Sequence, residues 1–165
     1  MLISKIQPPE WLQAETHPIG HSLSDIRISS KGFEQEFNRT FRNIDPIKEV
    51  LIAGLDHDGF DELYIVTVSA GLGSYGSVIG IASIQDERLS MIYFPQIELD
   101  DPVFEGYMGH DIFSIEIRRL VRSFPVYQGM DSNLVPTGGI REVIYSLSPG
   151  EAVPQLKIES VISAE

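Results

Sequence analysis

Cysteine is absent from this chain of 165 residues. Without a thiol, the protein can form no disulfide, hold no zinc ion through thiolates and use no cysteine nucleophile. The absence does not identify a cellular compartment, because many periplasmic proteins also lack cysteine.

Long apolar runs and basic residues are also scarce. The longest apolar run, Leu63–Val68, is interrupted by Thr67 and is far too short to span a bilayer, so we expect no transmembrane segment. The 12 basic residues face 24 acidic ones, which gives a formal net charge of −12. A field of that sign repels nucleic acid and anionic lipid. We therefore expect no nucleic-acid binding, and a cationic protein as the favoured partner.

The chain has the length of one domain with a substantial core. Residues 1–18 contain Pro8, Pro9 and Pro18 and show little periodicity, so we predict an irregular N-terminal arm there. Residues 19–165 are predicted to form a single β domain. The first residues lack a basic region followed by a long apolar core and a cleavage site, so we expect no leader within this sequence.

A hydrophobic period of two dominates the chain and favours β-strands over helices. The predicted strands cover residues 25–29, 33–41, 47–55, 63–69, 78–83, 89–94, 112–116, 120–126, 140–147 and 156–161. Residues 95–110 are rich in proline, glycine and acidic residues, which predicts a long loop. Short strands at regular spacing predict an all-β fold, either an antiparallel β-sandwich or a flattened barrel.

A glycine-rich loop separates two of these strands. Gly71, Gly73 and Gly76 fit the G-x-G-x-x-G pattern of dinucleotide sites, but that pattern requires a helix after the last glycine. The residues that follow, 77–83, are rich in β-branched side chains and predict a strand. We therefore expect a protruding hairpin loop and no nucleotide site. A tight hairpin also predicts a positive φ angle at Gly73 or Gly76.

Ser74 within this loop is a candidate nucleophile. A nucleophile elbow needs glycine two residues before and two residues after the serine, but Leu72 occupies the first of these positions. The candidate bases are His17, His21, His57 and His110, and no spacing ties any of them to Ser74. We therefore expect binding and not enzymatic catalysis. His110 and Asp111 are interpreted as a pair that supports the loop.

An acidic turn precedes the strand before the glycine loop. Asp56, Asp58 and Glu62 are spaced like calcium ligands, but Gly54 and Ile65 stand where the first acid and the bidentate acid are required. A tight Asp-Gly turn is the favoured interpretation, and a weak calcium site is the alternative. No other cofactor is expected.

Several motifs in one order resemble a known family. Residues 69–76, with the acidic turn before them, look like the periplasmic inhibitors of invertebrate-type lysozymes and their uncharacterised relatives. Further counterparts occur at residues 106–111, 120–127 and 136–141. The resemblance covers about residues 45–147.

The resemblance implies a function for the glycine loop. In that family a Ser-Gly-x-Tyr loop enters the lysozyme cleft, where its hydroxyls engage the catalytic carboxylates. The implied lysozyme-binding loop here consists of Gly71, Leu72, Gly73, Ser74, Tyr75 and Gly76. Gly73 and Tyr75 match the family pattern, whereas Leu72 stands where the family has serine. The resemblance also implies a bacterial periplasmic or envelope location, with a leader, soluble or lipid-anchored, outside this sequence.

Three functions follow from these observations. The first is an envelope protein that inserts the loop into a lysozyme cleft, a role that its net charge of −12 suits because lysozymes are cationic. The second is an envelope β-sandwich that binds another protein or a cell-wall glycan and has lost inhibition because Leu72 lacks a hydroxyl. The third is a calcium-stabilised structural module. A homodimer is a further candidate assembly.

Overall fold

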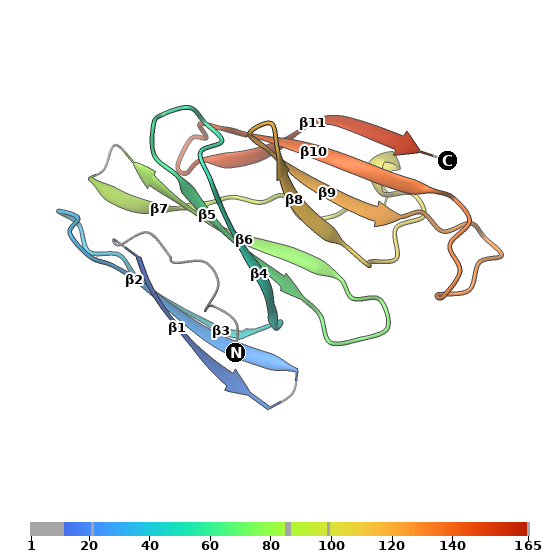
Figure 1. The fold of residues 1–165 in the computed structure, drawn as a ribbon, viewed down its shortest axis with the longest axis horizontal. Helices are drawn as coiled ribbons and strands as arrows, with labels where there is room; N and C mark the ends of the chain where they lie inside the picture. The colour runs from blue at the N-terminus through green and yellow to red at the C-terminus, as the bar shows by residue number, and fades with distance from the viewer. Residues whose placement is uncertain (1–11, 21, 85–86, 99, 165) are drawn as a thin grey trace.

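The computed structural model describes residues 12–20, 22–84, 87–98 and 100–164. They form an all-β protein with three antiparallel sheets, ordered β1-β2-β3, β4-β5-β6-β7 and β11-β10-β9-β8 (Figure 1). The prediction of an all-β fold is confirmed. The described strands form open, packed sheets, so the sandwich alternative is correct and the flattened barrel is not.

The strands follow one another along the chain from sheet to sheet. The first sheet contains β1 (Leu12–Ile19), β2 (Leu23–Ser30) and β3 (Asn38–Ile44). The second contains β4 (Ile47–Ala53), β5 (Glu62–Val68), β6 (Gly76–Ile84) and β7 (Arg88–Ile92). The third contains β8 (Ile112–Glu116), β9 (Arg119–Pro125), β10 (Ile140–Ser148) and β11 (Gln155–Ala164). A short 3₁₀ helix, η1 (Pro102–Phe104), interrupts the predicted long loop between β7 and β8.

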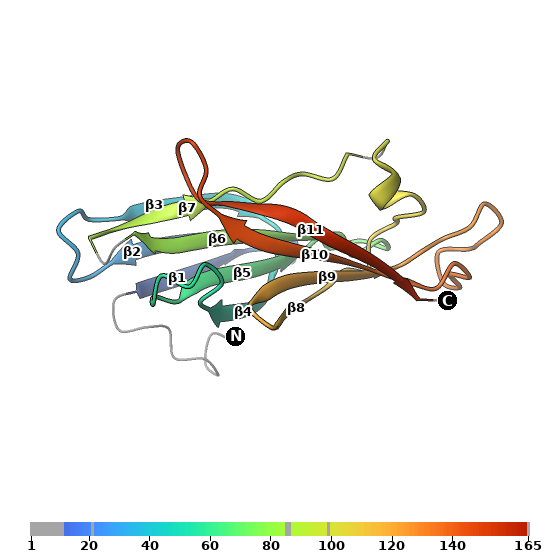
Figure 2. The same cartoon turned by 90° about the horizontal axis from the view of Figure 1, so that it is seen from above.

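The second sheet is covered on both faces, which makes the sandwich three layers thick (Figures 1 and 2). Strand β5 shows why, because successive side chains of a strand point to opposite faces. Leu63 and Ile65 pack in one core with strand β2 of the first sheet. Tyr64 and Val66 pack in the other core with residues of the third sheet such as Leu120. A strand buried on both faces reads as a continuous apolar run, as observed in the sequence.

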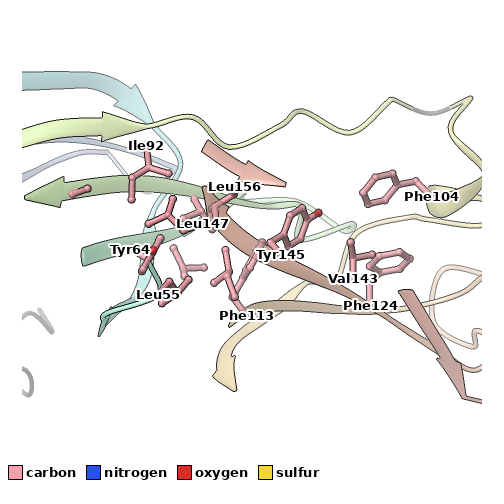
Figure 3. Close-up of a cluster of buried hydrophobic side chains, with 14 of the residues drawn as sticks. Leu55, Tyr64, Ile92, Phe104, Phe113, Phe124, Val143, Tyr145, Leu147 and Leu156 are labelled. Carbon is pink, nitrogen blue, oxygen red and sulfur yellow. The ribbon is translucent and has the colours of Figure 1, made fainter. Parts of the chain in front are cut away.

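The larger core lies between the second and third sheets (Figure 3). It extends from Leu55 and Tyr64 at one end to Phe104 and Phe124 at the other. The rings of Phe104 and Phe124 stack with centroids 5.9 Å apart, one of several aromatic pairs in this core. Close-packed rings of this kind leave side chains little freedom, so the inner face of β9 is rigidly held.

The prediction of an irregular N-terminal arm is wrong for residues 12–18. These residues belong to β1, which pairs with β2 from Leu12 opposite Ser30 to Ile19 opposite Leu23. The segment lacks hydrophobic periodicity because it is a mostly exposed edge strand, where Pro18 is also tolerated. The rest of the predicted arm, residues 1–11, lies outside the described residues.

The predicted strand at residues 33–41 begins too early. Residues 33–37 form bends and irregular backbone, and β3 begins at Asn38. Phe33, Phe37 and Phe41 nevertheless all pack against the smaller core. Their spacing of four residues therefore reports burial of the rings and not the backbone conformation. Within the described part of the chain, no helix has the length and apolar character required to cross a membrane.

Candidate functional site

The loop that connects β5 to β6, residues 69–76, is here called the glycine loop. Hydrogen bonds close its base, where the N–H of Ser69 donates to the carbonyl of Tyr75 and the N–H of Tyr75 donates to Ser69 Oγ, both at 2.9 Å. At its tip the N–H of Ser74 donates to the carbonyl of Gly71 at 3.2 Å. A strand, β6, begins at Gly76, where a dinucleotide site would require a helix. This confirms the hairpin and removes the dinucleotide interpretation.

The positive φ angle predicted at Gly73 or Gly76 occurs instead at Ser74, where φ is 44°. The two glycines are required for close packing. A Cβ atom on Gly73 would lie 2.4 Å from Cε2 of Tyr75, and one on Gly76 would lie 2.8 Å from Cβ of Asp111. Both distances are shorter than van der Waals contact. The glycines therefore let the loop fold back onto Tyr75 and onto the third sheet.

Two apolar side chains project from the glycine loop. Leu72 is 85% exposed and Tyr75 is 48% exposed. The ring of Tyr75 packs edge-on against Tyr107, with centroids 5.7 Å apart, so one side is fixed and the other faces solvent. The hydroxyl of Ser74 donates to the Gly71 carbonyl at 3.4 Å and is thus directed back into the loop. The loop therefore presents an aliphatic and an aromatic surface.

Residues 106–111 support the tip of the glycine loop. The N–H of His110 donates to the carbonyl of Gly73 at 2.7 Å. Gly109 has a φ of 87°, and a Cβ atom there would stand only 1.9 Å from the oxygen of Gly73. The two backbones can approach this closely only because residue 109 is glycine. The predicted loop-supporting role of the 110–111 pair therefore agrees with the geometry.

A buried ion pair holds the base of the loop. Asp111 and Arg122 are joined through Oδ1 and Nε at 2.6 Å, and their side chains are 0% and 2% exposed. The other carboxylate oxygen, Oδ2, accepts hydrogen bonds from the N–H of Gly76 and from the hydroxyl of Tyr107, both at 2.6 Å. Nη2 of Arg122 donates to the Gly76 carbonyl at 3.1 Å and to the Tyr107 oxygen at 2.8 Å. Both backbone polar groups of Gly76 are thus bonded to one buried network.

The surroundings of Arg122 and Tyr107 keep both groups protonated. Burial alone would lower the pKa of Arg122, but the hydrogen bond and the negative charge of Asp111 outweigh it and raise the pKa overall. Burial also raises the pKa of Tyr107, against the opposing charge of Arg122, so its hydroxyl stays protonated and donates to Asp111. Four aromatic rings surround the guanidinium at 5.1–6.0 Å, those of Phe94, Phe104, Tyr107 and Phe113.

A pocket of about 370 Å³ opens beside the glycine loop. Its walls include the rings of Tyr75, Phe94 and Tyr107, and Arg122 also lines it. The side chains of Ser77 and Gln96 add polar groups. Mostly apolar walls with a few polar groups are typical of small-ligand sites, so this pocket extends the surface that the loop presents.

Arg122 and Tyr107 are site residues that the sequence motifs did not predict. The alternation of residues along β9 could have identified Arg122. Leu120 and Phe124 are inward-facing core residues, and Arg122 stands between them on the same face. A charged residue at a core position of a strand requires a buried partner, here Asp111.

A second exposed loop lies toward the same end of the molecule as the glycine loop (Figures 1 and 2). In residues 127–139, Asp131 accepts hydrogen bonds from the N–H groups of Gln128 and Thr137 and from the Thr137 hydroxyl, at 2.7–2.8 Å. These backbone hydrogen bonds lower the pKa of Asp131. The three large apolar side chains of this loop are strongly exposed, namely Met130 at 99%, Leu134 at 87% and Val135 at 60%.

Contacts connect this second loop to the glycine loop. The rings of His110 and Tyr127 lie 6.3 Å apart, and His110 is the residue that donates to Gly73. The hydroxyl of Tyr127 donates to the carbonyl of Asn133 at 3.1 Å. Two ordered loops therefore present apolar side chains at one end of the sandwich.

The acidic turn brings its three predicted metal candidates together. One carboxylate oxygen from each of Asp56, Asp58 and Glu62 lies within 4.8 Å of the others. Glu62 is 1% exposed, and its Oε2 accepts from the N–H of Leu55 at 2.7 Å and from the hydroxyl of Tyr64 at 3.2 Å. Burial raises the pKa of Glu62 to about 7. The turn therefore contains a carboxyl group that favours its neutral form more than an exposed glutamate does.

Asp56 and Asp58 accept hydrogen bonds from nearby backbone N–H groups of the turn. Oδ1 of Asp56 accepts from the N–H of Asp58 at 3.1 Å, and Oδ1 of Asp58 accepts from the N–H of Phe60 at 2.8 Å. A Cβ atom on Gly54 would lie 3.0 Å from the Phe60 carbonyl oxygen, so an acid there would need the turn to move. Ile65 is 1% exposed in the smaller core and offers no ligand.

The candidate nucleophile Ser74 uses its hydroxyl within the glycine loop. Its hydroxyl is bonded to Gly71, and no hydrogen bond joins it to His17, His57 or His110. The fourth candidate base, His21, lies outside the described residues.

The chain matches no protein-family model, no curated protein and no solved structure.

Proposed function

We propose that this protein binds a lysozyme through the glycine loop and blocks the catalytic cleft. The observation that carries the proposal is the combination of a fixed base and an exposed tip. Asp111 and Arg122 hold Gly76 from within the core, while Leu72 and Tyr75 project into solvent. A loop that is already ordered loses little entropy on binding, and an exposed tyrosine is an effective interface anchor.

The charge of the protein supports the same partner. The chain carries −12, and a cationic lysozyme would be attracted to it over several ångströms before contact. Such steering mainly increases the association rate, whereas the loop contacts determine how long the complex lasts. The exposed apolar residues of the 127–139 loop extend the contact surface beside the cleft.

The position of Leu72 favours a second function. A leucine that is 85% exposed would be inserted where the resembling family presents a hydroxyl. A catalytic carboxylate buried against leucine loses its hydration without gaining a hydrogen bond, which costs on the order of 1–3 kcal/mol. The alternative is therefore an envelope protein that uses the same end to bind another protein or a cell-wall glycan. The pocket beside Tyr75 could accommodate part of such a glycan.

Both functions are proposed for the bacterial periplasm or envelope, where lysozymes and cell-wall glycan meet. Neither requires a catalytic residue or a cofactor. The proposed role is binding.

A cell-lysis assay tests the two functions together. Invertebrate-type, goose-type and chicken-type lysozymes are each added to a bacterial suspension with and without the protein, and the loss of turbidity is recorded. Protection against the invertebrate-type enzyme is the expected result. A parallel arm measures co-sedimentation of the protein with purified peptidoglycan. Sedimentation without protection supports glycan binding as the second function, and the absence of both contradicts lysozyme binding and glycan binding alike.

A further inference from the structure

A pocket of about 560 Å³ brings two edge strands together at the end of the molecule opposite the glycine loop (Figures 1 and 2). Residues 36–39 line it from the beginning of β3 in the first sheet, and residues 88–91 line it from β7 in the second sheet. Val153 lines it from the loop between β10 and β11. Volumes of this order are typical of binding pockets, and this one is here called the β7 pocket.

Part of the β7 edge inside this pocket is open. In an edge strand every second residue directs its N–H and C=O groups away from the sheet. Tyr93 does so where it bonds to the beginning of β11, and Glu87 does so where its carbonyl accepts from the N–H of Gln35 at 3.5 Å. Leu89 and Met91 lie between these two residues at the same spacing of two. The described backbone hydrogen bonds give neither of them a partner on this side.

The open groups are complementary to another extended chain. Each residue of this edge offers a donor and an acceptor, which the backbone of an added strand can satisfy together. A small anion could use only the N–H groups, because the carbonyl oxygens beside them would repel its charge. The bonds at Glu87 and Tyr93 close the two ends of the segment, so the edge has room for roughly five residues of an extended chain.

Two arginines flank the open edge from opposite faces. Arg88 lies opposite Ile84 in the β6–β7 ladder, and Ile84 packs against the larger core, so Arg88 is on that face. Arg39 lies opposite Ile28 of β2, which is in the smaller core, so Arg39 is on the face that the first sheet turns toward the second. Neighbouring residues of an added strand also point to opposite faces. Two adjacent side chains of an added strand are therefore directed to the faces that carry these arginines.

The charge of the β7 pocket favours carboxylates on the added strand. The ion pairs of the described residues involve Arg119 and Arg122, and neither Arg39 nor Arg88 has an acidic partner among them. Glu36 is the acidic residue of the lining, so two arginines against one glutamate leave it with a net positive charge, in a protein that carries −12. Arginine binds carboxylates through paired hydrogen bonds that are stronger than those between neutral groups.

We propose that the protein binds an acidic segment of another protein as an added strand along Leu89 and Met91 of β7. The backbone of this segment completes the open hydrogen bonds, and two adjacent carboxylates pair with Arg39 and Arg88. Its apolar side chains contact Phe37 in the pocket wall. The site does not rest on the proposed lysozyme binding, because it lies at the other end of the molecule from the glycine loop.

Fluorescence polarisation tests the proposal with the full chain and a labelled peptide, Thr-Val-Glu-Asp-Val-Thr, at physiological salt. We expect binding that saturates below about 1 mM peptide-binding protein. A neutral peptide with Gln and Asn at the two acidic positions should bind at least about fivefold more weakly. A peptide with N-methyl groups on both central residues keeps its charge but loses the amide donors, one of which faces β7 in either register. It should show no detectable binding.

Substitutions in the protein give a second readout. Arg39→Gln and Arg88→Gln should each raise the dissociation constant at least about fivefold. The matched control is Arg118→Gln, which removes the same charge from an exposed arginine at the β8–β9 turn, outside the pocket. It should change the dissociation constant less than about twofold, and circular dichroism checks the fold of the three variants.

Three results overturn the proposal. The first is the absence of saturable binding of the acidic peptide. The second is equal binding of the N-methylated peptide, which would show attraction between charges without strand pairing. The third is an equal loss of binding in Arg118→Gln and in the two pocket variants. None of these results affects the cell-lysis assay, so failure of this site and failure of lysozyme binding are distinguishable.

Discussion

The N–H of His110 donates to the carbonyl of Gly73 at 2.7 Å, and the neighbouring Gly109 leaves no room for a side chain beside that carbonyl. This contact joins two segments that are far apart in the sequence. It fixes the tip of the glycine loop to the loop that enters β8. The shape of the proposed binding surface is therefore determined by backbone contacts that only glycine permits.

Gly109→Ala should destabilise the protein and displace the glycine loop. The added Cβ would stand 1.9 Å from the Gly73 oxygen, at a φ of 87° that alanine rarely adopts. The expected loss of unfolding free energy is about 1–3 kcal/mol, measured by urea denaturation. Gly71→Ala is the matched control, since a Cβ there has no neighbour within 4 Å, and it should change stability by less than about 1 kcal/mol. Equal effects of the two variants would contradict the role assigned to Gly109.

Tyr75→Ala should weaken lysozyme binding far more than truncation of an exposed aromatic residue elsewhere. A buried tyrosine anchor contributes about 2 kcal/mol or more, which is more than tenfold in affinity. Phe60→Ala, in the acidic turn and 36% exposed in the wild type, serves as the control. Isothermal titration with an invertebrate-type lysozyme measures both. If the two variants bind alike, the glycine loop is not the binding element.

Leu72→Ser should strengthen inhibition at least several-fold. Serine restores a hydroxyl that can donate to a catalytic carboxylate, whereas Leu72 leaves that carboxylate without a hydrogen bond at a cost of about 1–3 kcal/mol. Because Leu72 is 85% exposed, the substitution should not change the stability of the free protein. Residual lysozyme activity at increasing inhibitor concentration is the measurement. Unchanged inhibition would show that residue 72 does not reach the catalytic carboxylates.

Arg122→Met should be strongly destabilising because it leaves Asp111 charged and buried without its partner. Loss of one member of a buried ion pair costs about 3–5 kcal/mol. The double variant Asp111→Asn with Arg122→Met should lose less than the sum of the two single variants, since neither charge is then left unpaired. Arg119→Met is the control, because the Arg119–Glu159 pair is exposed and should contribute about 1 kcal/mol or less. If the two single variants lose unfolding free energies that simply add up in the double variant, Asp111 and Arg122 do not stabilise each other.

Glu62 should make the protein less stable as the pH rises from about 4.5 to about 7. Burial raises its pKa in the folded protein from 4.5 to about 7, so the folded state holds the proton more tightly than the unfolded state. The unfolding free energy therefore falls through this window and levels off above it. At roughly 1.4 kcal/mol per pKa unit, the fall amounts to about 3 kcal/mol at most.

Glu62→Gln isolates this effect because glutamine does not titrate. The difference in unfolding free energy between wild type and Glu62→Gln should decrease across the same pH window, as measured by urea denaturation at several pH values. Other carboxyl groups contribute equally to both proteins and cancel. A difference that stays constant with pH would show that Glu62 has an ordinary pKa.

Calcium should change the melting temperature by less than about 2 °C at millimolar concentration, no more than magnesium does. A site with a dissociation constant 100 times lower than the calcium concentration would add about 2.7 kcal/mol, or more than about 5 °C for a domain of this size. The carboxylate cluster of the turn consists of Asp56, Asp58 and the largely buried Glu62, and one oxygen of each already accepts a hydrogen bond. A calcium-specific rise of several degrees would favour the structural-module interpretation.

The sequence was sufficient to predict the central strands, because burial leaves a direct trace in them. Strand β8 has the predicted bounds, β9 begins and ends one residue earlier than predicted, and β10 ends one residue later. Strand β1 was missed because an exposed edge strand needs only backbone hydrogen bonds from its neighbour, and these impose no hydrophobic pattern.

The support of the glycine loop could not be predicted from spacing alone. Asp111 and Arg122 are adjacent only because β8 and β9 pair in a particular register, and Gly76 joins them from a different sheet. The loop itself was identifiable from its glycines. The role of each glycine was not identifiable, because both a positive φ angle and a close approach of two chain segments select glycine. Only the coordinates distinguish these two reasons.

The buried network under Gly76 also constrains how the protein can change its partner over evolution. Substitutions at Asp111, Arg122 or Tyr107 would damage the fold before they altered recognition, because these side chains are buried in the core. Substitutions at Leu72 would alter recognition with little effect on the fold. The proposed recognition can therefore be varied through a few exposed positions while the buried support stays unchanged, much as antibodies vary loops on a constant framework.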